Sequence, residues 1–308
     1  RFIKNMIKNY FLKSFRKLFL RDIDDLKIQN GKLFENRIQK EIGAYKQLNE
    51  VYFKIFSQDF EDGIIQYLIK SLNINSVKFV EIGTQDYSES NTRYIYETIK
   101  CDGLIIDPYP NLKKHVGSLL RIWKNNLKIY NNFVDGENIN LILNNYSFNK
   151  NIDLFSIDID GIDYWVLKEI PKKISKIFIV EYNPYFGPSK EITTPNIKRF
   201  DRFKYHPTGF CWGASLKAIL NLMNEKGYKF LGTNRLNNNA FFLNEDYLSF
   251  VNIDLPSTND LTFFTNAKFN IFKKNNNMTS SFEMIKDDIL DLEIFDLKEK
   301  KKVKFINI

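Results

Sequence analysis

The stretch IDLFSIDIDGIDYWVLKEI, Ile152–Ile170, joins an apolar strand pattern to a helical pattern through Gly161. It contains four aspartates in an otherwise apolar run, and buried strands rarely contain so many carboxylates unless the strand ends at a site that uses them. Asp158 and Asp160 stand where the strand pattern ends, and their spacing of two predicts that they begin on one face. Asp153 is expected to face solvent, and Asp163 to lie in the first turn of the helix, where a negative charge suits the dipole.

The alternation of strand and helix continues on both sides of this stretch. Strand patterns are expected at 77–83, 104–107, 127–134, 152–160, 176–183, 229–234 and 239–244. The first five alternate with helical patterns, which predicts an α/β protein with a doubly wound parallel sheet. We expect a helical N-terminal extension over 1–72, an α/β domain over 73–248 and a C-terminal extension of strands and loops over 249–308.

Composition places the chain among globular proteins with a sizeable core. It has 308 residues, 44% hydrophobic and 27% charged, and a net charge of +8. This charge is compatible with nucleic acid or an anionic membrane as partner, but lysine is spread thinly and no known nucleic-acid-binding motif is present. The two cysteines, Cys101 and Cys211, indicate neither a disulfide framework nor a zinc site. Neither a membrane span nor a secretory signal is indicated, and we expect a cytoplasmic protein.

The first 21 residues contain basic side chains and no acids. Ile3, Ile7, Phe11, Phe15 and Phe19 recur at near-helical spacing, which predicts a basic amphipathic helix. Such a helix either lies on an anionic membrane surface or packs its apolar stripe on a protein. We favour packing on the protein's own body or on a partner, and keep peripheral membrane contact as the alternative.

Each of the first five strand patterns ends near an acid, and ligands of doubly wound sheets bind at the carboxyl ends of the strands. The residues concerned are Glu81, Gly83, Asp107, Asp135, Asp158, Asp160 and Glu181. Gly83 allows a tight turn towards a ligand, and a helix is expected to begin near Ser88. Gln85 and Tyr87 stand where a dinucleotide fingerprint has further glycines, which favours a ligand without phosphates. Asp107 either binds ribose hydroxyls or caps the following helix.

The motifs FVEIGTQDYSESNTRYI, GLIIDP and ENIN resemble the cofactor half of class I S-adenosylmethionine-dependent methyltransferases. LFSIDIDGIDYWVLKEI resembles the FkbM-type motif, and VEYNPYFG, GASLKAI, EKGYKFLGTN and NAFFL resemble blocks of bacterial methyltransferase-like proteins. The resemblance covers about residues 77–245. Two features depart from the family pattern: the second and third glycines of the first loop are missing, and Asp160 stands where glutamate is usual.

The resemblance implies a seven-strand Rossmann-like sheet with an antiparallel last strand, and S-adenosylmethionine as cofactor. The residues it implies for cofactor binding are Glu81, Gly83 and Gln85 in the first loop, Asp107, then Asp135, Glu137 and Asn138 near the adenine, and Asp158 near the methionine end. Methyl transfer to oxygen requires alignment and a base for the hydroxyl proton, and Asp160 and His206 are the expected bases. His206 is equally compatible with a loop histidine that is bonded to backbone.

The proline-containing segment 184–212 is too long for an ordinary connection and is expected to be a binding loop or packed lid. The expected substrate-binding residues are Glu181, Tyr182, Asn183, Arg202 and Trp212, and Asn239 is a further candidate for bonding a hydroxyl. Asp158, Asp160 and Glu181 offer hard oxygen ligands that suit Mg²⁺. In the competing interpretation, Asp160 caps the next helix and Glu181 binds substrate hydroxyls.

These observations favour an S-adenosylmethionine-dependent O-methyltransferase that acts on a hydroxyl of a sugar, glycan or small metabolite. The substrate rests on family analogy alone. The missing glycines favour the alternative, a non-catalytic methyltransferase-like module that binds or scaffolds in surface-polysaccharide assembly.

Overall fold

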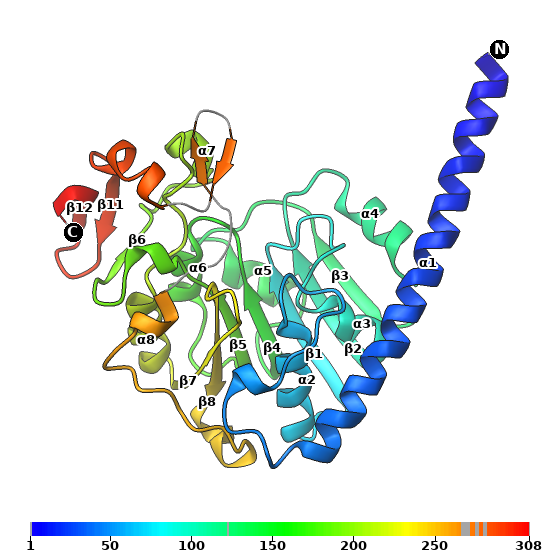
Figure 1. Cartoon of the computed structure of the whole chain (residues 1–308), viewed down its shortest axis with the longest axis horizontal. Helices are drawn as coiled ribbons and strands as arrows, with labels where there is room; N and C mark the ends of the chain where they lie inside the picture. The colour runs from blue at the N-terminus through cyan, green and yellow to red at the C-terminus, as the bar shows by residue number, and fades with distance from the viewer. Residues whose placement is uncertain (1, 122, 266–271, 275–276, 280–281, 308) are drawn as a thin grey trace.

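The computed structural model describes residues 2–121, 123–265, 272–274, 277–279 and 282–307. A seven-stranded sheet in the order β3-β2-β1-β4-β5-β8-β7 forms its centre (Figure 1). The strands are β1 (Ser76–Ile82), β2 (Lys100–Ile106), β3 (Asn126–Tyr130), β4 (Ile152–Ile157), β5 (Ser175–Glu181), β7 (Tyr228–Thr233) and β8 (Asn239–Asn244). β1 to β5 are parallel, whereas β8 is antiparallel to both β5 and β7. This is the Rossmann-like methyltransferase fold, so the predicted fold class is confirmed.

Helices cover both faces of the sheet, as the alternating strand pattern predicts. The helices are α1 (Phe2–Glu41), α2 (Glu61–Ser71), α3 (Arg93–Thr98), α4 (Leu112–Leu119), α5 (Ile139–Asn145), α6 (Asp163–Glu169), α7 (Arg202–Tyr205) and α8 (Leu216–Glu225). Val77 and Phe79 of β1 join a hydrophobic cluster with α1 to α4, while Val80 and Ile82 join a second cluster with α5, α6 and α8. Successive strand residues point to opposite faces, so β1 contributes to both clusters.

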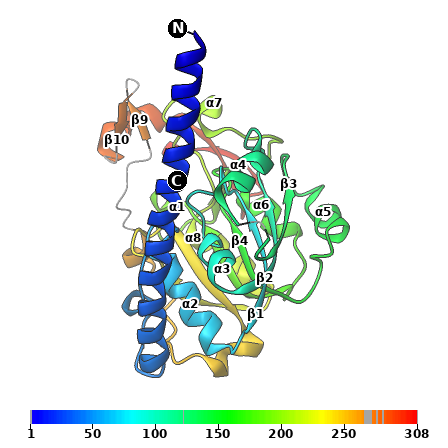
Figure 2. The same ribbon diagram turned by 90° about the vertical axis from the view of Figure 1, so that its right-hand side faces the viewer.

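The N-terminal helix α1 is longer than predicted, because it continues through residue 21 to Glu41. Its second half is tied to α3, where Arg93 forms an ion pair of 2.6 Å with Asp24 and the Tyr94 hydroxyl donates to Glu35. Its first turns project beyond the rest of the chain (Figures 1 and 2). The structure does not describe the side chains of residues 1–20. The packing of their apolar stripe on a protein therefore stays a prediction. Among the described residues, no helix combines the length and apolarity needed to cross a membrane.

The segment between α1 and α2 is held at the end of the sheet by buried acids. The Asp62 carboxylate accepts the backbone N–H groups of Ile55, Phe56 and Ser57. The Glu61 carboxylate accepts the side-chain amides of Asn234 and Asn239, on either side of the β7–β8 turn. Residues 55–62 therefore form one wall at the carboxyl ends of the strands.

The segment after β5 and the C-terminal segment together form a small lobe above the carboxyl ends of the strands. β6 (Ile192–Thr193) pairs with β11 (Glu293–Asp296), which pairs in turn with β12 (Lys301–Lys304). A separate hairpin consists of β9 (Phe272–Lys274) and β10 (Asn277–Thr279). A third hydrophobic cluster contains residues of both segments, including Ile192, Phe210, Phe272, Ile289 and Ile294. The C-terminal residues thus support the long loop, a role that the sequence did not predict.

Candidate functional site

A cavity of about 470 Å³ lies at the carboxyl ends of β1, β2, β4 and β5, beneath the small lobe. A side chamber of about 100 Å³ shares part of its lining with the cavity. The shared residues are Gln58, Gly83, Gln85 and Asp158. The predicted site residues that line the main cavity are Gly83, Gln85, Asp107, Asp158, Asp160, Glu181, Arg202 and Trp212. A volume of about 300–1,000 Å³ is usual for a small-molecule site.

The loop after β1 has an unusual backbone. Gly83 has φ +86°, and non-glycine residues Gln85 and Tyr87 have φ +48° and +67°. A left-handed conformation costs a non-glycine residue about 1–2 kcal/mol. Gln85 and Tyr87 therefore adopt the conformation that glycine favours, at the two positions where the related motif has glycine.

Gly83 is required by the fold, because its position leaves no room for a side chain. A Cβ atom at Gly83 would lie 1.4 Å from the backbone oxygen of Asp158, because the end of β1 presses against the end of β4. The tight turn was predicted correctly, but the close approach is to protein backbone. The helix expected near Ser88 begins instead at Arg93, because residues 90–92 form a loop that is bound to Glu81.

Two predicted cofactor residues, Glu81 and Asp107, anchor the backbone of this loop. The buried Glu81 carboxylate accepts the Ser90 hydroxyl at 2.6 Å and the N–H of Asn91 at 2.9 Å. Asp107 accepts the N–H of Gln85 at 2.7 Å and that of Tyr109 at 2.7 Å. Burial raises the pKa of both carboxyls above the ordinary value. Asp107 faces the main cavity, whereas Glu81 lines only the side chamber.

Asp135 and Asn138, expected near an adenine, form a local cap at the start of α5. Asp135 accepts the N–H groups of Glu137 and Asn138, and Asn138 accepts the N–H of Asp135. Neither residue lines the cavity, so a place beside an adenine in this cavity is not supported. Their reciprocal hydrogen bonds form the start of α5 instead. Their neighbours Phe133 and Val134 line the cavity in their place.

Asp158 and Glu181 come together at the ends of the neighbouring strands β4 and β5. Asp158 directly follows β4, Glu181 is the last residue of the adjacent strand β5, and both line the cavity, so the two carboxyl groups are neighbours that do not both ionise readily. Burial and the nearby charge of Asp160 raise the pKa of Asp158 to about 8. Burial and the Asp158 charge raise the pKa of Glu181 well above its ordinary value. The pairing of Asp158 with Glu181 replaces the predicted pairing of Asp158 with Asp160.

Asp160 also lines the cavity, but it lies beyond the end of β4 at Ile157 and adopts φ +52°, so it no longer follows the strand period. Its half-exposed carboxylate forms an ion pair of 2.5 Å with Arg202. Among the described residues, no three carboxylate, histidine or cysteine side chains are grouped so that they could hold a metal ion. The expected Mg²⁺ site of Asp158, Asp160 and Glu181 is therefore not supported. Asp160 does not cap α6 either, because the N-cap residue is Ile162 and no side-chain hydrogen bond caps this helix in the described part of the chain.

Three other predicted residues have structural positions. The Tyr182 hydroxyl donates to the Phe264 carbonyl oxygen, and the Asn183 amide donates to the carbonyl oxygens of Phe210 and Trp212. His206 bonds Thr208 through Nδ1, and burial lowers the pKa of its imidazole. None of the three lines the cavity, so the base role of His206 and the substrate role of Tyr182 and Asn183 are not supported. Asp153 is also corrected: it is buried and accepts from Lys78 N–H and Lys176.

Sequence reasoning missed part of the cavity wall. The missed lining residues include Gln58, Pro108, Phe133, Val134, Phe200, Phe203, Asn238 and Met278. Gln58 comes from the N-terminal segment and Met278 from the C-terminal hairpin, both far from the recognised motifs in sequence. The excess of aromatic residues in segment 184–212 was the available signal for Phe200.

Several buried polar atoms around this cavity have no hydrogen-bond partner within the described part of the chain. They are Glu181 Oε2 and Trp212 Nε1 in the main cavity, and Thr84 Oγ1 and Asn239 Oδ1 in the side chamber. Buried polar groups are normally paired, because an unpaired one costs about 1–3 kcal/mol. These atoms therefore indicate a bound polar ligand or water.

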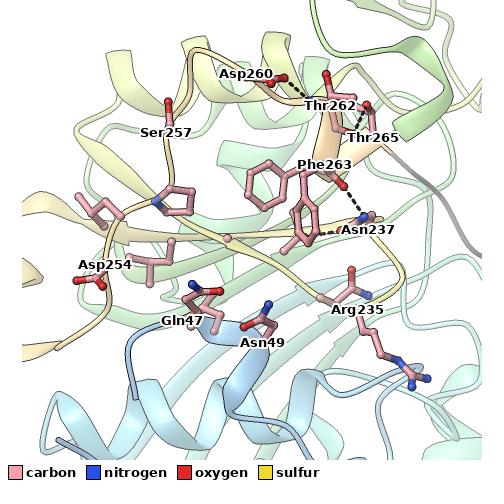
Figure 3. A pocket seen from close by; sticks show the side chains of 18 residues that line it. Gln47, Asn49, Arg235, Asn237, Asp254, Ser257, Asp260, Thr262, Phe263 and Thr265 are labelled. Carbon is pink, nitrogen blue, oxygen red and sulfur yellow. Dashed lines mark hydrogen bonds between the residues drawn. The ribbon is translucent and has the colours of Figure 1, made fainter. Parts of the chain in front are cut away.

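A second cavity of about 1010 Å³ lies beside the β7–β8 turn, between residues 47–49 and 254–265 (Figure 3). Two of its polar side chains are bonded within the protein: Asn237 donates to the Phe263 carbonyl oxygen, and Asp260 accepts the Thr262 N–H. None of the unpaired buried atoms found among the described residues belongs to its lining. The smaller cavity is therefore the candidate site.

Comparison with known proteins gives no family assignment. No protein family matches the chain, and no curated protein matches it. Among solved structures, the N-terminal domain of EvdMO1 with SAH bound is 11% identical, with 69% of this chain and 94% of that chain covered and a TM-score of 0.39. TehB from Haemophilus influenzae is 11% identical, with 57% and 60% covered and a TM-score of 0.34. Coclaurine N-methyltransferase bound to N-methylheliamine and SAH is 11% identical, with 70% and 72% covered and a TM-score of 0.35. Likenesses this distant carry no argument about activity, and the fold assignment rests on the strand order.

Proposed function

We propose that this chain is an S-adenosylmethionine-dependent methyltransferase that methylates a hydroxyl group of a sugar, glycan or small metabolite. The observation that carries the proposal is the cavity at the strand ends, bordered by a loop with left-handed backbone at positions 83, 85 and 87. The resemblance of the sequence motifs to FkbM-type methyltransferases supports the same reaction. The missing glycines are the main argument for a non-catalytic module. Gln85 and Tyr87 adopt the left-handed backbone that glycine would favour at these positions, which weakens that argument.

The cavity has the features that this cofactor needs. Asp107 has an acceptor for ribose hydroxyls at the end of β2, and Phe133 and Val134 provide apolar contact for a flat base. Asp158 lies near the proposed position of the sulfonium, whose positive charge a carboxylate favours. The unpaired Thr84 and Asn239 oxygens in the side chamber are acceptors for an amino group.

Calorimetric titration with S-adenosylhomocysteine tests cofactor binding. We expect wild-type protein to bind, and Asp107→Asn to bind about 10–100-fold more weakly, because a hydrogen bond to a charged group contributes about 1.5–3 kcal/mol. Asp102→Asn is the matched control, because Asp102 lies on the same strand and does not line the cavity. Absence of binding by the wild type would remove the proposal in favour of a non-catalytic module.

The hydroxyl acceptor is tested separately by transfer of radiolabelled methyl from S-adenosylmethionine to a panel of sugars, nucleotide sugars and glycans. Phe200, Phe203 and Trp212 line the cavity, and aromatic side chains stack on sugar rings. Label in an alkali-stable ether product would support O-methylation. Label only in amines would contradict it.

We also propose a cytoplasmic protein, in which contact of the first turns of α1 with the inner membrane surface is the alternative to packing of this helix on a protein. The two cysteines are free and buried, and residues 1–21 contain no acid while they contain several lysines and arginines. We expect the wild type to float with vesicles that contain anionic lipid, and a chain without residues 1–20 to float less. Equal flotation of the two chains would contradict the membrane contact.

A further inference from the structure

We propose that Asp158 and Glu181 hold one shared proton between them, and that Glu181 is the base that takes the acceptor's hydroxyl proton during methyl transfer. This inference rests on the proposed function. It assigns the base to Glu181, which the sequence indicated as a substrate-binding residue, in place of Asp160 and His206.

The first argument is the position of the pair. Glu181 is the last residue of β5, and Asp158 directly follows β4 on the adjacent strand, so the sheet places both carboxyls at one edge. Both residues line the same cavity, and Glu181 is buried. Glu181 therefore lies at the main cavity, whereas His206 does not line it.

The second argument is the charge around the pair. The nearby acids are Asp160, Asp163 and Glu81, each of which opposes ionisation of Asp158. Asp160 is occupied by Arg202, and among the described residues no ion pair joins Asp158 or Glu181 to a cation. Two adjacent carboxyls without a cation do not both ionise readily, so they share a proton.

The third argument is the complementary pair of unpaired atoms. Glu181 Oε2 is an acceptor without a donor, and Trp212 Nε1 is a donor without an acceptor, both within the described part of the chain. A hydroxyl group both donates and accepts, so an alcohol has the two functions that these atoms lack in the described part of the chain. An ammonium cannot accept from Trp212, and an ionised carboxylate cannot donate to Glu181. The two unpaired atoms of the main cavity therefore exclude these two charged groups and are compatible with an alcohol, as with other neutral groups that both donate and accept.

The step balances with the residues present. A lone pair of the acceptor oxygen forms the bond to the methyl carbon, and the bond between that carbon and the sulfonium sulfur breaks with its electrons on sulfur. The acceptor proton moves to Glu181 Oε2. The sulfonium loses one positive charge and the carboxyl pair loses one negative charge. The main cavity therefore has the same net charge before and after transfer.

The shared proton has a consequence for binding that requires no acceptor. The positively charged sulfonium of S-adenosylmethionine favours ionisation of the adjacent pair, whereas neutral sulfur of S-adenosylhomocysteine does not. Calorimetry in buffers of different ionisation enthalpy counts the protons released. We expect the wild type to release up to one proton more with S-adenosylmethionine than with S-adenosylhomocysteine.

Two variants separate the protons released by the Asp158–Glu181 pair from those released by the cofactor's own amino group. In Glu181→Gln and in Asp158→Asn, the repulsion between the two carboxyls is removed while burial still raises the pKa of the one that remains, so the extra proton release should fall below the wild-type value. Glu97→Gln should keep the extra release, because Glu97 pairs with Lys124 away from the cavity. Affinity for S-adenosylhomocysteine and circular dichroism check that each variant is folded. Equal extra release in wild type and Glu181→Gln, or none in wild type, would overturn the shared proton, while failure of both cofactors to bind would overturn the proposed function itself.

Discussion

Replacing Gly83 with alanine is expected to destabilise the protein by about 3 kcal/mol or more and to abolish cofactor binding. The new Cβ atom would lie 1.4 Å from the backbone oxygen of Asp158. The left-handed φ of +86° adds strain that an alanine does not relieve. Relief requires β1 and β4 to separate at their carboxyl ends, where Asp158 faces the cavity. The fold and the site therefore depend on the same contact.

Thermal and urea unfolding of Gly83→Ala measure the loss, and titration with S-adenosylhomocysteine measures the site. Gly117→Ala is the matched control, because a Cβ at Gly117 in α4 meets nothing within 4 Å. The control should be unchanged or more stable by up to about 1 kcal/mol, since alanine favours a helix. Unfolding of Gly83→Ala at the wild-type midpoint would contradict the close packing of β1 on β4.

The sheet was predictable because its signals are local. Short apolar runs alternate with helical patterns, and parallel strands bring their carboxyl ends to one edge whatever the loops do. The cavity followed from this rule. The loop backbone did not follow, because glycine was the expected sign of left-handed conformation, and Gln85 and Tyr87 adopt it without being glycine.

The roles of the acids were less predictable, because their hydrogen-bond partners are distant in sequence. Glu81, Asp107 and Asp163 resemble site residues by position, yet each accepts backbone N–H groups of a loop. Asp158 and Asp160 were expected to share a face by the period of a strand, but the strand ends before them and Asp160 takes a left-handed φ. Strand periodicity therefore misled once the strand had ended.

The parts of the cavity wall that come from segments distant in sequence could not be predicted from sequence patterns. Gln58 reaches the cavity because Asp62 and Glu61 hold residues 55–62 against the sheet end and the β7–β8 turn. Met278 reaches it from the hairpin β9–β10 in the C-terminal segment, which packs on the long loop. Neither contact leaves a periodic trace in the sequence, so neither was expected.

The largest kinetic effect is expected from Glu181→Gln, once an acceptor from the panel is in use. A positioned base contributes about 10²–10⁴-fold to rate, so kcat should fall by that factor while affinity for S-adenosylhomocysteine is retained. Asp160→Asn should lower kcat by less than about 10-fold and mainly raise KM, because it removes the partner of Arg202 rather than the base. Steady-state rates for both variants separate the base that the structure indicates from the base that the sequence indicated.

The pH profile distinguishes a base from a residue that only shapes the cavity. Burial and the neighbouring carboxyl raise the pKa of Glu181, so its active, ionised form is lost as pH falls through that raised value. Wild-type kcat should therefore rise with pH above the ordinary range of a glutamate, whereas the residual rate of Glu181→Gln should lack this rise. A profile that keeps its rise in Glu181→Gln and loses it in Asp160→Asn would assign the proton to Asp160. That result would also require the Asp160–Arg202 ion pair to open during each turnover, because the Asp160 carboxylate accepts from the Arg202 guanidinium.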